Sequence, residues 1–150
     1  MPQLRVDAKD ILCALGYRNT AIGAPVLEAA RDAARRLDSL LTPGVACSLM
    51  EIEKLTDADV VFETGDTLTH APLARMLRGC THALVAVMTV GGGPDRLVND
   101  CFQAGDALSA MMLDAAGTAA VLRYAAQAKD ALCDVVRRAL GPEFGLTAGL

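Results

Sequence analysis

The fold is decided by the stretch Ala83-Leu84-Val85-Ala86-Val87-Met88-Thr89-Val90, followed by Gly91-Gly92-Gly93-Pro94. An uninterrupted apolar run rich in β-branched residues is typical of a strand whose two faces are both buried. Glycine permits the sharp turn that must follow such a strand, and proline stops the strand. We therefore expect residues 83–90 to form the central strand of a sheet, with a helix from Asp95 to about Gly105.

A long helical stretch comes next, from the capping residue Asp106 to about Leu140. Its first half is apolar on nearly every side and rich in alanine, so other elements can approach its backbone closely. We expect this stretch to be the core helix. Gly141 and Pro142 end it, and the residues from Glu143 to Leu150 have the pattern of an extended segment.

Two helices are expected before the sheet. Apolar residues recur at helical spacing from Val6 to Leu15, and Gly16 ends that segment; the second helix starts at Pro25 and ends at Pro43-Gly44. A strand with one buried face is then indicated by the alternating residues Val45, Cys47, Leu49 and Ile52. Shorter elements are expected at 60–62 (strand), at Leu68 (strand) and at 72–77 (helix).

This order of elements predicts an α+β fold. We expect a small, mostly antiparallel sheet packed against several helices, including the long C-terminal core helix. No repeat and no low-complexity linker interrupts the sequence, which therefore favours a single domain over residues 1–150.

Composition excludes several classes of protein. The net charge is −4 and only 3% of the 150 residues are aromatic, which argues against a nucleic-acid partner because phosphates need clustered basic residues. The longest uncharged stretch, Gly79–Pro94, is too short for a membrane-spanning helix. Five widely spaced cysteines without a Cys-x-x-Cys pair favour reduced, mostly buried thiols in a cytoplasmic protein and no metal site.

Two groups of residues are candidates for binding. The Gly91-Gly92-Gly93 run lies between a strand and a helix, where backbone amides can hold an anion, but the same glycines also suit a simple tight turn. Asp106 and Asp114 fall on one stripe of the apolar helix, and each has a structural alternative, a helix cap for Asp106 and an internal partner for Asp114. No pattern indicates a catalytic residue, and His70 and His82 are isolated.

Several motifs then occur in an order that resembles a known family. Leu12-Cys13-Ala14-Leu15-Gly16-Tyr17-Arg18 stands near the start, Leu77–Ala83 leads into Val87-Met88-Thr89-Val90-Gly91, and Leu113-Asp114-Ala115-Ala116-Gly117-Thr118 follows Ala104-Gly105-Asp106. This series is similar to the activation domain of cobalamin-dependent methionine synthase, and more closely to short free-standing relatives of that domain. The resemblance extends from about Asp7 to the C-terminus.

The resemblance implies a function in methionine biosynthesis. Such domains bind S-adenosylmethionine and present its methyl group to a cobalamin held by another protein or domain. An electron from a flavoprotein reduces inactive cob(II)alamin, and methyl transfer traps it as methylcobalamin. The methyl donor and the cobalamin carry this chemistry, so few acid–base residues are needed. We expect contacts to the methyl donor from the residues Thr89, Gly91, Gly92, Asp106 and Asp114.

Two features depart from the family pattern. Much of the family's S-adenosylmethionine site lies in a later Arg-x-x-x-Gly-Tyr-like segment, whereas this sequence ends at Leu150, where that segment is due. We therefore expect about two-thirds of the domain and an incomplete methyl-donor site. Relatives also often carry an acid where this sequence has Leu122 and Arg123. The alternative is a non-catalytic module that docks on a corrinoid protein, or pairs with itself as a homodimer, without binding the methyl donor.

Overall fold

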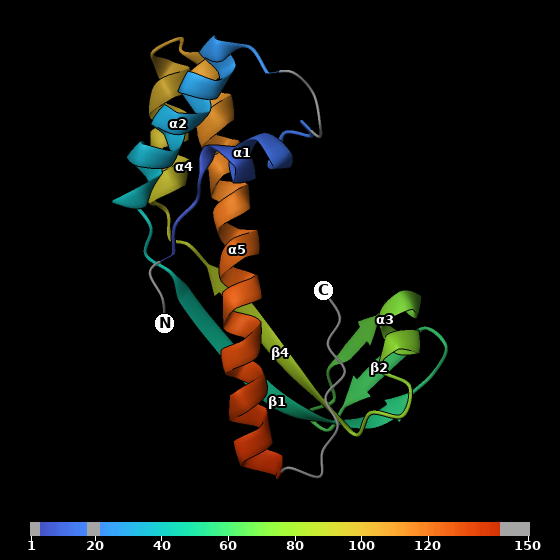
Figure 1. Cartoon of the computed structure of the whole chain (residues 1–150). Helices are drawn as coiled ribbons and strands as arrows, with labels where there is room; N and C mark the ends of the chain where they lie inside the picture. Colours follow the sequence, from blue (N-terminus) through green and yellow to red (C-terminus); the bar gives the residue numbers. More distant parts are fainter. Residues whose placement is uncertain (1–3, 18–21, 142–150) are drawn as a thin grey trace. The chain divides into compact units, whose positions relative to one another are not determined.

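The computed structural model describes residues 4–17 and 22–141, and these form an α+β fold, as expected. Five helices and four strands occur in the described residues (Figure 1). In chain order they are α1 (Ala8–Ala14), α2 (Ala24–Asp38), β1 (Gly44–Leu55), β2 (Asp59–Phe62), β3 (Thr67–Thr69), α3 (Ala71–Met76), β4 (His82–Thr89), α4 (Gly93–Gln103) and α5 (Ala107–Leu140). The antiparallel sheet and the long C-terminal helix are both confirmed.

The described residues fall into two compact units. One lies within Met1–Val45 and Met88–Lys129 and contains α1, α2, α4 and the first part of α5; we call it the helical unit. The other lies within Ala46–Val87 and Asp130–Leu150 and contains α3 and most of the sheet; we call it the sheet unit.

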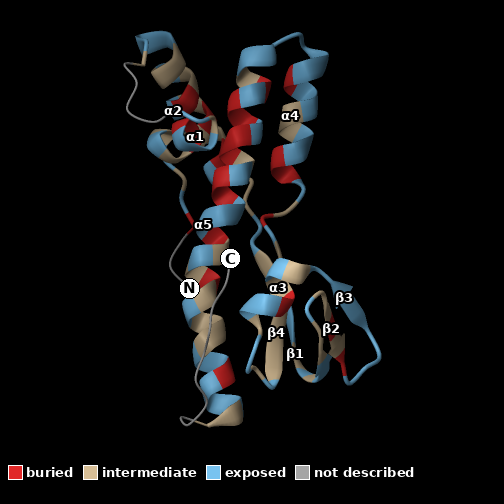
Figure 2. Cartoon of the chain, turned by 90° about the vertical axis from the view of Figure 1, so that its right-hand side faces the viewer, coloured by how far each residue is buried: buried red, intermediate tan, exposed pale blue. Residues whose placement is uncertain are grey.

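The helical unit is built around α5. Buried residues, red in Figure 2, concentrate along the part of this helix that belongs to the helical unit. Many of them are alanines, and Ala110, Ala116 and Ala120 are fully buried. Since an alanine side chain is a single methyl group, neighbouring elements can pack against the α5 backbone at short range.

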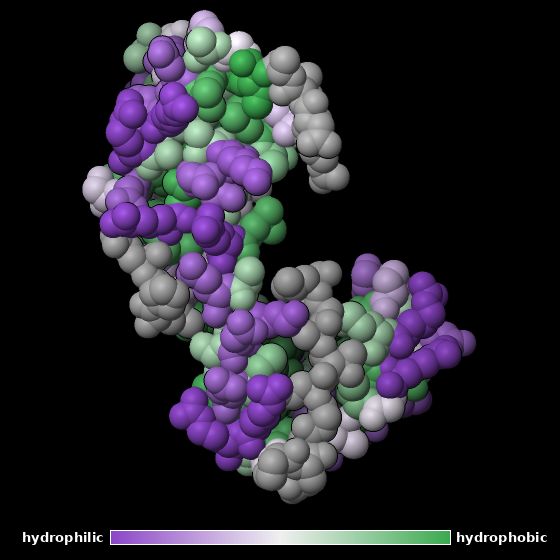
Figure 3. Space-filling model, viewed as in Figure 1, coloured by the Kyte–Doolittle hydropathy of each residue, from purple (hydrophilic) through white to green (hydrophobic). Residues whose placement is uncertain are grey.

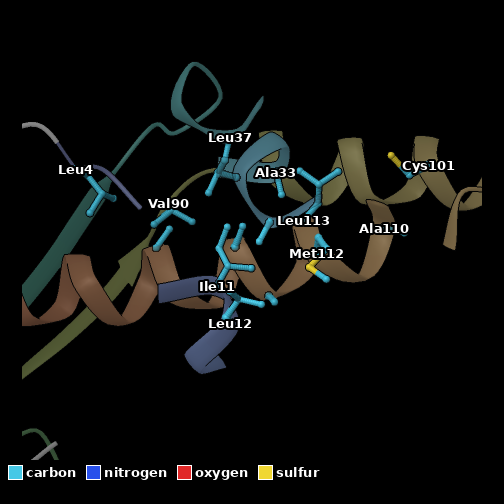
Figure 4. Close-up of a cluster of buried hydrophobic side chains, with 14 of the residues drawn as sticks. Leu4, Ile11, Leu12, Ala33, Leu37, Val90, Cys101, Ala110, Met112 and Leu113 are labelled. Carbon is cyan, nitrogen blue, oxygen red and sulfur yellow. The ribbon is translucent and has the colours of Figure 1, made fainter. Parts of the chain in front are cut away.

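Helices α1 and α2 cover this core through one apolar side each. Asp7 caps α1, because its side chain accepts a hydrogen bond from the Asp10 N–H while the Asp10 side chain accepts one from the Asp7 N–H. On α2 the residues Ala30, Ala33 and Leu37 are buried, whereas hydrophilic side chains gather over its outer side (Figure 3). Figure 4 shows Ile11, Leu37 and Leu113, from three helices, converging in one apolar cluster.

The sheet has the strand order β3-β2-β1-β4. Strand β1 pairs antiparallel with β2, with Leu55 opposite Val60, and its register shifts between Ile52 and Lys54. Within the sheet unit Val60 and Phe62 from β2 and Ala74 from α3 form a second buried cluster. A capping residue, His70, accepts a hydrogen bond from the Leu73 N–H at the start of α3.

Two expectations about the strands are wrong. Strand β4 was expected to be central and buried on both faces, but it lies at the edge of the sheet and Val87 is 71% exposed. The buried face of β1 was expected to carry Val45, Cys47, Leu49 and Ile52, but Val45 and Cys47 are exposed, whereas Ile52 packs against the second cluster together with Met50. Because side chains alternate along a strand, Met50 and Ile52 share one face of β1, and Val45 and Cys47 lie on the other.

The helix boundaries agree better with the sequence. Helix α5 begins after Asp106 and ends at Leu140, and Gly16, Gly79 and Gly141 all have a positive φ, as suits glycines that end helices. Helix α2 ends earlier than expected, at Asp38 instead of Pro43. The sequence also predicts a loop at 17–20 between the first two helices, and most of it lies outside the described residues, as does the expected extended segment at 143–150.

Candidate functional site

One cavity of about 270 Å³ lies in the helical unit, between the end of β4, the start of α4 and the middle of α5. Three of the five residues expected to bind the methyl donor line it: Thr89, Gly91 and Asp114. The other lining residues are Met88, Val90, Pro94, Asp95, Val98, Leu113, Gly117, Thr118 and Val121. The structure therefore brings together residues from two of the motifs on which the family resemblance depends.

The turn at Gly91 forms one wall of this cavity. Gly91 has a φ of +87°, a backbone conformation that residues with a side chain rarely adopt. Its N–H donates to the Thr89 hydroxyl oxygen at 3.0 Å. A side-chain carbon on Gly91 would also overlap the hydroxyl of Thr42. The turn is thus a position that only glycine can fill, as the structural alternative for this run predicted.

The next two glycines differ from Gly91 and from each other. Gly93 is buried, and a side-chain carbon on it would lie 2.6 Å from the Leu40 carbonyl oxygen. Gly92 is exposed, and only the Arg96 guanidinium lies near the position of a side-chain carbon, at 3.4 Å. Gly92 precedes α4 as its N-cap and does not line the cavity, so its expected contact with the methyl donor has no support in this geometry.

The N-terminus of α4 is poorly suited to an anion. Asp95 lies in its first turn and lines the cavity, so a negative charge already occupies the place where the helix dipole would attract an anion. Pro94 also lacks the backbone N–H that a phosphate would need there. No lysine, arginine or histidine is among the lining residues. The cavity therefore has the electrostatic character of a site for a cation or for hydroxyl groups.

Asp114 is exposed, although the sequence suggested a carboxylate on a buried stripe of α5. Neither of its two expected alternatives, an internal hydrogen bond or an arginine partner, occurs among the described residues. Asp95 is likewise without a partner in the described part of the chain. Two unpaired carboxylates thus face one cavity, accompanied by the hydroxyls of Thr89 and Thr118.

Asp106 caps a helix, which is the structural alternative to ligand binding that the sequence offered for it. Its carboxylate accepts a hydrogen bond of 3.1 Å from the Ser109 N–H, which makes it the N-cap of α5. The Ser109 hydroxyl and backbone N–H, together with the charge of Arg36, lower the pKa of the Asp106 carboxyl below its ordinary value of 3.8. Asp106 does not line the cavity, so the structure separates it from the other candidate residues.

Nine lining residues were not among the candidates, and three of them bear on the charge and shape of the cavity: Asp95, Gly117 and Thr118. The position of Asp95, directly after the glycine turn and Pro94, could have indicated from the sequence that its carboxylate lies near that turn. Gly117 and Thr118 follow Asp114 at spacings of three and four residues, which places all three on one side of a helix. A small residue at Gly117 leaves room between α5 and Pro94, whose side chain lies 3.7 Å from where a carbon on Gly117 would be.

The cysteines offer no site in the described residues. Only Cys101 is buried, whereas Cys13 and Cys47 are exposed, so the expectation of mostly buried thiols is wrong. The Cys101 sulfur accepts a hydrogen bond from the Arg36 guanidinium at 3.4 Å. Within residues 4–17 and 22–141 no group of His, Cys, Asp and Glu side chains could hold a metal ion. None of the described helices has the length and apolar character needed to cross a membrane.

Comparisons with known proteins do not add to this picture. No protein-family model matches the chain, and no curated protein matches it.

Proposed function

We propose that this chain is a reactivation module of a cobalamin-dependent methyltransferase with methionine synthase activity. In this role it orients S-adenosylmethionine for the reductive methylation of a cob(II)alamin that a corrinoid protein carries. Asp95 and Asp114 would face the sulfonium donor, and the partner's cobalamin, once reduced by one electron from a separate reductant protein, would take the methyl group and leave S-adenosylhomocysteine. The chain itself supplies binding and orientation, and no catalytic side chain.

One observation carries this proposal. Thr89 and Gly91 come from the strand-end motif, and Asp114, Gly117 and Thr118 come from the motif on the long helix, yet all five line the same cavity. These two motifs are separated in the sequence, and the family resemblance implies the same ligand for both. Their convergence supports a shared ligand more strongly than either motif does alone.

The chemistry of the lining agrees with the proposed ligand. S-adenosylmethionine carries a positive sulfonium, a positive ammonium and a ribose diol. The unpaired carboxylates of Asp95 and Asp114 can attract the positive charges, and carboxylate or hydroxyl oxygens can accept hydrogen bonds from the ammonium or the diol. The apolar side chains of Met88, Val90 and Val98 suit the non-polar parts of such a molecule.

The size of the cavity indicates that it encloses a part of the ligand. Its volume of about 270 Å³ lies just below the range of about 300–1,000 Å³ that is usual for small-molecule pockets. Affinity would therefore depend strongly on the few polar contacts that this wall supplies. This argument makes the two carboxylates the first residues to test.

The test is calorimetric titration with S-adenosylmethionine and with S-adenosylhomocysteine, which lacks the sulfonium charge. We expect the charged ligand to bind more tightly, and we expect Asp114→Asn to weaken its binding more than that of the neutral analogue. Asp100→Asn is the matched control, because Asp100 is an exposed acid of α4 that does not line the cavity. The proposal fails if neither ligand binds, or if Asp100→Asn has the same effect as Asp114→Asn.

A second candidate function is a docking module without methyl-donor binding. Large apolar side chains are exposed near the connection of α4 and α5, with Phe102 58%, Leu108 45% and Met111 45% exposed. Such side chains suit contact with another protein surface. Two results together would favour this candidate over the first. The chain would capture a corrinoid-binding domain and lose this ability in the Phe102→Ser variant, and calorimetric titration with S-adenosylmethionine would show no binding.

A further inference from the structure

Strand β4 leaves one side of its backbone available for pairing. It has β1 on one side, and in the described part of the chain no strand pairs with its other side. The strand is eight residues long and contains no proline, lysine, arginine or acid, which are the residues that usually protect an edge. An edge of this kind readily accepts another strand.

The register of β4 on β1 defines which residues face outward. The Ile52 N–H donates to the Thr81 carbonyl at 2.8 Å, and Gly44 lies against Thr89. Gly44 precedes Ile52 by eight residues and Thr89 follows Thr81 by eight, so both contacts belong to one antiparallel register. In an antiparallel pair the N–H and C=O of a residue point to the same side, and successive residues alternate. Odd-numbered residues of β4 therefore bond to β1, while Leu84, Ala86 and Met88 direct their backbone groups to the free edge.

We infer that two copies of this chain associate through β4, edge to edge and antiparallel, about a two-fold axis at Ala86. A two-fold axis perpendicular to the sheet keeps the faces of both copies aligned, and an axis at an outward-facing residue makes the pair at the axis a hydrogen-bonded one. Ala86 lies between Leu84 and Met88, so these two residues also form hydrogen-bonded pairs. The resulting pairs are Ala86 with Ala86, Leu84 with Met88 and Val85 with Val87 of the other copy, with about six backbone hydrogen bonds in all.

Charge favours a second copy as the occupant of this edge. In a symmetric contact each residue near the axis meets its own equivalent, so any charge there would meet a like charge. Strand β4 lies within the longest uncharged stretch of the chain, Gly79–Pro94, and no such repulsion arises. The contact would also pair Val87, the most exposed large apolar residue of the described chain, with a β-branched neighbour.

The experiment measures molar mass by sedimentation equilibrium, without any ligand, so its outcome is independent of the proposed function. We expect the wild type to have twice its 15.6 kDa chain mass at micromolar concentration. Ala86→Lys and Ala86→Glu each place like charges opposite each other, at a Cα separation of about 5.5 Å, and are expected to be monomeric. An equimolar mixture of the two variants is expected to restore the dimer.

A further variant distinguishes loss of the dimer from misfolding of the chain. Ala86→Pro removes an N–H that points to the free edge and leaves the pairing with β1 intact, so a folded monomer is expected, with an unchanged circular dichroism spectrum. A monomeric wild type at several hundred micromolar would overturn the inference. A dimer that persists in all three variants, or charge variants that stay monomeric when mixed, would also overturn it.

Discussion

Gly91 lies directly against Thr42. The Thr42 N–H donates to the Val90 carbonyl at 2.9 Å, and any side-chain carbon on Gly91 would overlap the Thr42 hydroxyl. This contact holds the segment between α2 and β1 against the turn that forms one wall of the cavity. Two separate constraints, a positive φ and a close neighbour, therefore act on the same residue.

Gly91→Ala is expected to lower the free energy of unfolding by roughly 2–4 kcal/mol, because the left-handed conformation and the overlap each carry a cost. Chemical denaturation measures this change. Gly92→Ala is the matched control, since Gly92 has a negative φ and an open environment, and we expect a loss below about 1 kcal/mol.

A second substitution separates the two costs. In a Thr42→Ala background the overlapping hydroxyl is absent, so Gly91→Ala should cost less there than in the wild type. Strictly additive effects in the double-mutant cycle would show that the contact with Thr42 contributes nothing.

Asp114→Asn is expected to leave the stability within about 0.5 kcal/mol of the wild type, because Asp114 is exposed and has no partner in the described residues. The same substitution should weaken S-adenosylmethionine binding roughly tenfold, the size expected for one charge-assisted contact. Asp95→Asn should behave alike, since both carboxylates line the cavity. A large drop in melting temperature without a change in affinity would mean that the carboxylate is structural.

Asp106→Asn tests the cap of α5. The pKa of the folded-state carboxyl is lower than the ordinary value of 3.8, so its ionised form stabilises the fold. That stabilisation is complete at neutral pH and is lost as the pH falls through 3.8 towards the lower folded-state pKa. We therefore expect the wild type and Asp106→Asn to differ in melting temperature at pH 7 and to converge at low pH. A difference that does not change with pH would refute this assignment.

The Asp10–Arg123 ion pair joins α1 to α5 in the helical unit. Both side chains are partly exposed, so a double-mutant cycle should give a coupling of about 0.2–1 kcal/mol that shrinks at high salt. Asp10→Ala should cost more than Arg123→Ala, because Asp10 also accepts a hydrogen bond from the Asp7 N–H in the α1 cap. Equal losses from the two single variants would contradict this division of roles.

The helices could be predicted because their signals are local. A capping residue at Asp106, a proline near Ala24 and a glycine at 16 mark helix ends wherever the helix lies in the fold. The position of β4 could not be predicted in the same way. An apolar run reports how side chains are buried, whereas an edge or a central position depends on which strands lie alongside, which is a non-local property.

The candidate site was predictable in part for a similar reason. Thr89, Gly91 and Asp114 belong to motifs, and the structure places them around one cavity. Asp106 has the residue type and spacing of a binding group, but its bond to Ser109 shows a cap. Asp95 was missed because a single acid at the start of a helix is common, and only its place in the lining of the cavity that Asp114 also lines gives it significance.

The alanine-rich face of α5 makes the core of the helical unit respond asymmetrically to changes in side-chain volume. Ala116 and Ala120 have almost nothing to lose by truncation, so alanine scanning, the usual probe of a core, cannot detect their importance. Enlargement is different, because close packing leaves no room for additional methyl groups. Substitutions on this face of α5 are therefore limited by an upper bound on side-chain size, and hydrophobicity alone does not describe that limit.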